Sequence, residues 1–263
     1  MFDLEAYVER IGIDEHASVA EVHRAHVMAI PFENLDPHRG VPVSLEPDAL
    51  SDKLVRRRRG GYCFEQNLLL KAGLEALGAE VEVMLARVRV GVPPGTVRPR
   101  SHLVLRVHAG GEALLADVGF GVGTLLEPIP FEPGPAHEQL GWRYRLVSEG
   151  PELVLQSQED GIWKDMYAFL PEPVPRVDIE VSNWFTCTYP RSPFVTGLNV
   201  AAQRADGSRI AVGDWEGLAL KEQTPEESKS TPVAWESVPE LLERLFDLPG
   251  FALREDGRVV PAG

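Results

Sequence analysis

The chain has 263 residues, of which 44% are hydrophobic and 25% charged, a composition typical of a globular protein and not of disordered, collagen-like or coiled-coil chains. Its 26 basic and 40 acidic side chains give a net charge of −14, which disfavours nucleic acid as a partner. With no apolar run that could span a bilayer, no signal peptide and two cysteines, too few for a disulfide framework, the sequence predicts a reduced cytoplasmic protein that does not bind membranes.

The first part of the chain is predicted to be helical. Apolar residues at helical spacing predict a helix over residues 4–11. Ser18 and Glu21 form a capping box that opens a second helix, which runs to about Ile30. Pro47 suits the first turn of a third, shorter helix.

The next predicted helix, residues 63–77, carries a candidate nucleophile. It begins at Cys63, directly after Gly60 and Gly61 and four consecutive arginines at 56–59. A helix N-terminus with nearby positive charge favours a thiolate over a thiol. The alternative is a buried structural cysteine, which is our interpretation of Cys187 because it lacks the glycine and arginine context.

From about residue 80 the apolar pattern changes to period two, which predicts strands. Two alternating runs, 101–108 and 112–118, flank Gly110–Gly111 and predict a β-hairpin. Further short strands around Trp142, Leu153 and Trp163 favour a small barrel or sandwich.

The last third reads as mixed α and β structure. A short helix is expected over 183–194 and a hairpin at Asp206–Gly207. Ser237 and Glu240 are expected to cap a final helix that ends near Phe246.

The hairpin geometry selects a partner for Cys63. With Gly110 and Gly111 as the turn, His102 and Asp117 are diagonal neighbours on one face. Asp117 lies in an apolar strand, where a buried carboxylate requires a partner. Cys63, His102 and Asp117 therefore form a candidate triad of nucleophile, base and orienting acid. The alternative is a structural His–Asp contact.

Other motifs carry weaker signals. His23 and His26 stand three residues apart on the second predicted helix, but without further metal-ligand spacing we expect them on a surface face and predict no metal site. The sequence GFGVG at 119–123 lacks a surrounding βαβ unit, which excludes a dinucleotide-binding fingerprint. It is expected to form a flexible loop beside Asp117.

Four motifs, in order, resemble those of the arylamine N-acetyltransferases. They are PFENL at 31–35, RGGYCFEQN at 59–67, Ser101–His102 followed by ADVGFG at 116–121, and NWFTCTYPRSPF at 183–194. The resemblance implies an α+β fold with an N-terminal helical bundle over 1–79, a central β-barrel over 80–190 and a C-terminal α/β lid over 191–263.

The same resemblance implies a ping-pong reaction. Acetyl-CoA, a co-substrate, would acylate Cys63, and an arylamine, hydrazine or N-hydroxyarylamine would then take the acetyl group. No bound cofactor is implied, and the protein would be a monomer or a weak homo-oligomer. An internal ion pair between Glu33 and Arg59 is also implied. The candidate residues for substrate and CoA binding are Phe32, Arg59, Phe120, Gly121 and Thr124.

Three other functions are open. Two of them use the same triad, and the third needs no catalytic residues. An amide synthase of the same superfamily would act on a larger polyketide acyl chain. A thiol peptidase would use the same three side chains on a peptide. A non-catalytic binding module would leave Cys63 as an ordinary thiol.

Overall fold

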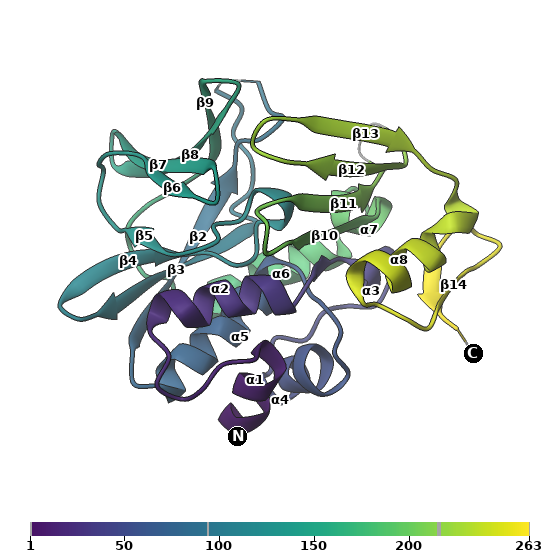
Figure 1. The fold of residues 1–263 in the computed structure, drawn as a ribbon, viewed down its shortest axis with the longest axis horizontal. Helices are drawn as coiled ribbons and strands as arrows, with labels where there is room; N and C mark the ends of the chain where they lie inside the picture. The colour runs from purple at the N-terminus through teal and green to yellow at the C-terminus, as the bar shows by residue number, and fades with distance from the viewer. Residues whose placement is uncertain (1, 94, 215–216, 263) are drawn as a thin grey trace.

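The computed structural model describes residues 2–93, 95–214 and 217–262. Its N-terminal part is helical, as predicted (Figure 1). Ser18 and Glu21 form the expected capping box at the start of the second helix. The elements are α1 (Leu4–Ile11), α2 (Val19–Ala29), α3 (Leu35–His38), α4 (Pro47–Leu50), a π-helical turn (Ser51–Arg56) and α5 (Cys63–Ala76).

The central part is an antiparallel sheet of eight strands in the order β5-β4-β3-β2-β9-β8-β7-β6. The sheet curls into a nearly closed barrel, and Gln139 on the edge strand β6 bridges the gap. Its side chain accepts the N–H of Leu126 at 2.8 Å and donates to the carbonyl of Glu127 at 2.7 Å, just before the other edge strand. The strands are β2 (Glu80–Val88), β3 (His102–Ala109), β4 (Glu112–Ala116), β5 (Ile129–Pro130), β6 (His137–Gln139), β7 (Trp142–Glu149), β8 (Glu152–Glu159) and β9 (Ile162–Phe169).

The C-terminal part holds a second antiparallel sheet, of five strands, in the order β1-β10-β11-β12-β13. Its first strand, β1 (Phe32–Glu33), comes from the N-terminal region, so the predicted units share a sheet. The remaining elements are α6 (Arg176–Thr188), α7 (Pro193–Thr196), β10 (Asn199–Gln203), β11 (Arg209–Gly213), β12 (Ala219–Gln223), β13 (Ser228–Pro232), α8 (Val238–Phe246), β14 (Phe251–Leu253) and β15 (Val259–Pro261).

One predicted boundary and one predicted cap were wrong. The helix expected over 183–194 is α6, which begins at Arg176 and ends at Thr188, because its buried face already starts at Ile179. Ser237 does not cap α8 with its side chain. A 3-10 turn precedes the helix and gives Ser237 a helical backbone, so its hydroxyl donates to the carbonyl of Ala234 at 2.7 Å instead.

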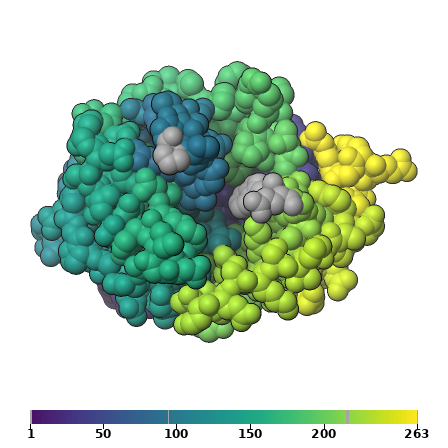
Figure 2. All heavy atoms as spheres, turned by 90° about the horizontal axis from the view of Figure 1, so that it is seen from above, coloured from purple at the N-terminus to yellow at the C-terminus, as the bar shows by residue number. Residues whose placement is uncertain are grey.

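The two sheets lie beside each other above the N-terminal helices (Figure 1). Figure 2 shows the molecular surface hollowed between the barrel, in teal, and the C-terminal strands, in yellow-green. One hydrophobic core joins the helices to the barrel, and a second joins the C-terminal sheet to α8. Among the described residues, no helix has the length and apolar character needed to cross a membrane.

Candidate active site

Cys63 is the first residue of α5 and is only 2% exposed. The chain reaches it through Gly60 and Gly61, which pass so close to their neighbours that side chains would not fit. A Cβ at Gly60 would lie 2.2 Å from the carbonyl oxygen of Pro31. Glu65 Oε2 accepts the N–H of Tyr62 at 3.1 Å and closes the first turn of the helix. The sulfur atom therefore lies at a rigid helix N-terminus, where the helix dipole favours negative charge.

The hairpin has the predicted register, with His108 opposite Ala113 and Leu105 opposite Ala116. His102 and Asp117 consequently lie on one face. His102 Nε2 donates to Asp117 Oδ2 at 2.7 Å, and both side chains are buried. The predicted His–Asp contact is confirmed.

Asp117 is held as a carboxylate. Asn67 Nδ2 and the N–H of Gly119 both donate to its Oδ1 at 2.9 Å. Burial acts to raise the pKa of Asp117, but the charge and hydrogen bond of His102, together with these two donors, keep it below its usual value.

His102 is held as an imidazolium. Burial acts to lower its pKa, but the charge of Asp117, its hydrogen bond and the interaction with Cys63 raise the pKa of His102 to about 10. A pKa of about 10 favours the charged ring near neutral pH. Its Nε2 faces the Asp117 carboxylate, and Cys63 Sγ lies 3.7 Å from the carbonyl oxygen of Ser101, the residue before His102. A basic ring close to a cysteine at a helix N-terminus is the kind of arrangement that cysteine enzymes use to activate a thiol.

Asn67 was not predicted as part of the site. Besides donating to Asp117, it donates to the carbonyl of Leu103 at 2.7 Å and accepts the N–H of Val118 at 3.0 Å. It follows Cys63 by four residues, so both lie on one face of α5. That spacing was a signal in the sequence.

The expectation that His23 and His26 lie on a surface face was wrong, because both are fully buried. His23 Nδ1 contacts the carbonyl of Leu126 at 3.3 Å, and its Nε2 accepts the N–H of Asp117 at 3.2 Å. Burial lowers the pKa of His23 to about 4 and that of His26 to about 3, so both rings are neutral. No cluster of three or more His, Cys, Asp or Glu residues that could hold a metal occurs in the described part of the chain.

A buried charge cluster supports the turn before Cys63. The implied pair is present, with Arg59 Nη2 2.6 Å from Glu33 Oε1. Its other members were not predicted: Lys53 Nζ lies 2.7 Å from Asp36 Oδ2 and 2.8 Å from Glu65 Oε1. Burial and the charge of Glu33 outweigh Lys53 and raise the pKa of Glu65 to about 7.

Of the remaining candidate residues, Phe120, Gly121 and Thr124 lie on the loop after Asp117, whereas Phe32 and Arg59 lie elsewhere. Phe120 meets the His102 ring edge-on at 5.0 Å between centroids, and Thr124 Oγ1 donates to the carbonyl of Asp117 at 2.7 Å. Gly121 continues the same loop with a φ of 69°. Phe32 is buried on β1 against Phe194.

Arg59 lies apart from this loop, in the charge cluster and over the Phe251 ring, with its Cζ atom 5.0 Å from the ring centroid. Its guanidinium is therefore already engaged by protein groups, and a substrate contact at Arg59 stays a prediction.

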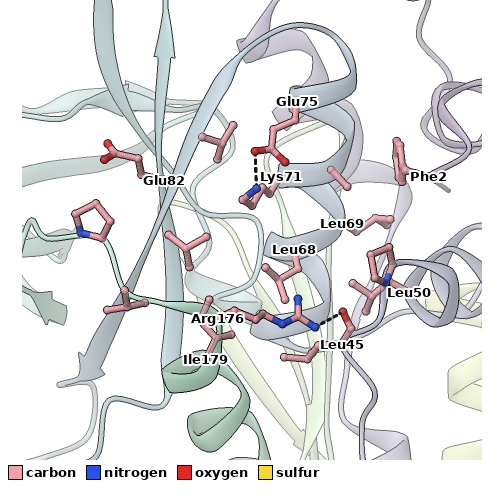
Figure 3. Close-up of a pocket in the computed structure, with 16 residues that line it drawn as sticks. Phe2, Leu45, Leu50, Leu68, Leu69, Lys71, Glu75, Glu82, Arg176 and Ile179 are labelled. Atoms are coloured by element: carbon pink, nitrogen blue, oxygen red, sulfur yellow. Dashed lines mark hydrogen bonds and ion pairs between the residues drawn. The ribbon is translucent and has the colours of Figure 1, made fainter.

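A separate apolar pocket of about 470 Å³ lies along α5, between α4, β2 and the start of α6 (Figure 3). Leu68, Leu69 and Leu50 line its floor, and Lys71 and Arg176 stand at its edge, each near a carboxylate or carbonyl oxygen. None of the three triad residues lines it.

Comparison with known proteins places this geometry in a family. A profile described as N-acetyltransferase matches residues 17–250. An arylamine N-acetyltransferase of Mycolicibacterium smegmatis is 44% identical over 217 residues, 78% of each chain. An arylamine N-acetyltransferase / N-hydroxyarylamine O-acetyltransferase of Salmonella typhimurium is 32% identical over 250 residues, covering 93% of this chain and 88% of its own.

The fold agrees. The structure of Mycobacterium marinum arylamine N-acetyltransferase in complex with CoA superimposes with a TM-score of 0.88 at 36% identity, covering 94% of this chain and 93% of that one. The chain belongs to the arylamine N-acetyltransferases, a family of CoA-dependent acyltransferases.

Proposed function

We propose that this enzyme transfers an acetyl group from acetyl-CoA to an arylamine through an acetyl-cysteine intermediate. In the first half-reaction the Cys63 thiolate attacks the thioester carbonyl, the bond from that carbon to the CoA sulfur breaks, and CoA leaves with the proton of His102. The free-energy change of this half-reaction is small, because one thioester replaces another.

In the second half-reaction the amine nitrogen attacks the acetyl-cysteine carbonyl. Neutral His102 takes the amine proton, the C–S bond breaks, and the Cys63 thiolate returns beside an imidazolium. Acylation itself prepares His102 for this step. It removes the thiolate that helps raise the His102 pKa, so the ring gives up its proton more readily in the acyl-enzyme.

Asp117 fixes the direction of the ring throughout. It accepts a hydrogen bond from Nε2 of His102, which leaves Nδ1 as the nitrogen available to the sulfur and the substrates. Asp117 stays charged because its oxygens accept from three donors, those of His102, Asn67 and Gly119.

Aromatic side chains beside His102 suit an arylamine acceptor. Phe120 and Tyr167 have ring centroids 5.0 and 4.9 Å from that of His102, and such walls pack against aromatic rings. An arylamine is weakly basic, so its nitrogen is unprotonated and nucleophilic near neutral pH. The relatives named as arylamine N-acetyltransferases support this acceptor class.

The observation that carries the proposal is the junction of a helix-terminal sulfur with a buried His–Asp pair. Intact mass spectrometry after mixing with acetyl-CoA tests it directly. The wild type should gain one acetyl group, lose it when an arylamine is added, and give parallel-line kinetics. Cys63→Ala should gain none, whereas Cys187→Ala, the matched control at the other buried cysteine, should behave as the wild type.

The alternatives give different results when other acyl thioesters or peptides replace acetyl-CoA. Acylation only by bulky acyl thioesters would indicate an amide synthase. Amine release from peptides without acyl transfer would indicate a thiol peptidase. An unreactive Cys63 would indicate a binding module and overturn the proposal.

A further inference from the structure

Arg209, on β11, is an unusual buried cation. It is 4% exposed, and among the described residues no carboxylate forms an ion pair with its guanidinium, although the charge of Glu159 acts on it from farther away. The guanidinium lies over the Trp142 ring, with Cζ 3.4 Å from the centroid. Its Nη2 donates to the hydroxyl of Tyr144, and its Nε has no hydrogen-bond partner among the described atoms. Burying a cation without a counter-charge is costly, so the side chain is a poor choice if packing were its only role.

From Arg209 a series of hydrogen bonds leads, through Tyr144 and Thr124, to the main-chain carbonyl of Asp117. Tyr144 Oη donates to the carbonyl of Thr124 at 3.0 Å, and Thr124 Oγ1 donates to the carbonyl of Asp117 at 2.7 Å. The directions are fixed by chemistry. Arginine can only donate, so the Tyr144 oxygen accepts and its single proton goes to Thr124. The two bonds use different groups of Thr124, its carbonyl and its hydroxyl, so the path holds the backbone of this segment in place from both sides.

The cross-strand partner of Arg209 contacts the same segment, residues 117–124, at Gly121 and Val122. Gln203 on β10 pairs with Arg209, and its Nε2 donates to the carbonyls of Gly121 and Val122, both at 3.1 Å. Two neighbouring side chains of the C-terminal sheet thus contact the 117–124 segment of the barrel, directly or through Tyr144.

The 117–124 segment needs such anchors. It contains Gly119, Gly121 and Gly123, which leave the backbone few intrinsic restraints. It also carries Asp117 and Phe120, which contact His102 on two sides. A small shift of this segment would change the direction of the imidazole.

We infer that Arg209 is a positioning residue, which holds the catalytic loop in place through Tyr144 and Thr124 and so couples the C-terminal sheet to the His102–Asp117 pair. The inference builds on the proposed triad mechanism. It gives the second sheet a role in the chemistry beyond covering the barrel.

The test measures the alkylation of Cys63 by iodoacetamide across pH, in a Cys187→Ala background, together with single-turnover acetylation from acetyl-CoA. Arg209→Met and Tyr144→Phe should each lower both rates by about three- to thirtyfold, the range expected for couplings along such networks. Their double variant should be no slower than the slower single variant, because both changes break one chain. Arg209→Lys should recover part of the rate, since its ammonium can still donate to Tyr144.

Arg145→Met is the matched control. Arg145 also stacks on a tryptophan, with Cζ 4.1 Å from the Trp163 centroid, but its Nε donates to Gln156 and not toward the loop. It should leave both rates unchanged.

Additive losses in the double variant, or wild-type rates in Tyr144→Phe, would overturn the inference. Tyr144→Phe removes one oxygen and decides the question even if Arg209→Met does not fold. If the wild type reacts with iodoacetamide but not with acetyl-CoA, the proposed function fails, while the alkylation rates still test the positioning role.

Discussion

Replacing Lys53 by methionine tests whether the charge cluster behind Cys63 holds the active-site turn. Lys53 is 6% exposed, and its Nζ lies 2.7 Å from Asp36, 2.8 Å from Glu65 and 3.7 Å from Glu33. The variant would leave Glu33 with Arg59, Asp36 with Arg39 and Arg59, and Glu65 without a cation in direct contact. Removing one partner of a buried ion pair costs about 3–5 kcal/mol, a large part of the roughly 5–15 kcal/mol that stabilises a folded domain.

Equilibrium urea denaturation measures this loss. The loss should be smaller in mild acid. The pKa of Glu65 is about 7 with Lys53 beside it and would rise further without that cation, so Glu65 is then protonated and the uncompensated charge is smaller. Lys164→Met is the control. Lys164 pairs with Glu159 but is 54% exposed, so its loss should stay within about 0.5 kcal/mol. A loss below about 1 kcal/mol in Lys53→Met would show that the reasoning about uncompensated charge is wrong.

Three further predictions concern the same region. Folding raises the pKa of Glu65, so the folded state binds this proton more tightly than the unfolded state does. The stability of the wild type, relative to that of Glu65→Gln, should therefore fall as pH rises from about 4.5 to 7. Paired denaturation series of the two proteins would measure this difference. Gly119→Ala would place a Cβ 2.6 Å from the Cα of Cys63. It should lower the free energy of unfolding by about 1–3 kcal/mol and remove most of the activity. Gly134→Ala, whose Cβ meets nothing closer than 3.8 Å, should be neutral in the same thermal melts and turnover assays. Asp117→Asn keeps the shape but removes the charge, so steady-state turnover should fall by about 10²–10⁴-fold; wild-type turnover would refute its role.

The His–Asp pair could be predicted from the sequence because side chains on a strand alternate strictly between its two faces. Once Gly110–Gly111 is the turn, a slip of one residue would place His102 and Asp117 on opposite faces. The start of α5 at Cys63 was equally well marked, by the two glycines that precede it.

Other features needed the three-dimensional structure. Lys53 joins carboxylates from three separate segments, and no local pattern indicates that they converge. Helical spacing could not reveal that α2 is covered at His23 and His26, since polar side chains suggest an exposed face unless a partner is known. The start of α6 was missed because Ile179 is the only buried residue of the helix before Asn183, so no apolar stripe marks its first turns.

The protonation state of His102 tests the central claim most directly. Nitrogen NMR of the labelled imidazole rings, assigned with a His102→Gln variant, would report it at about pH 8, below the His102 pKa of about 10. We predict an imidazolium with both ring nitrogens protonated in the resting enzyme, changing toward the neutral ring when Cys63 is acetylated. A neutral ring in the resting enzyme would contradict the thiolate–imidazolium pair.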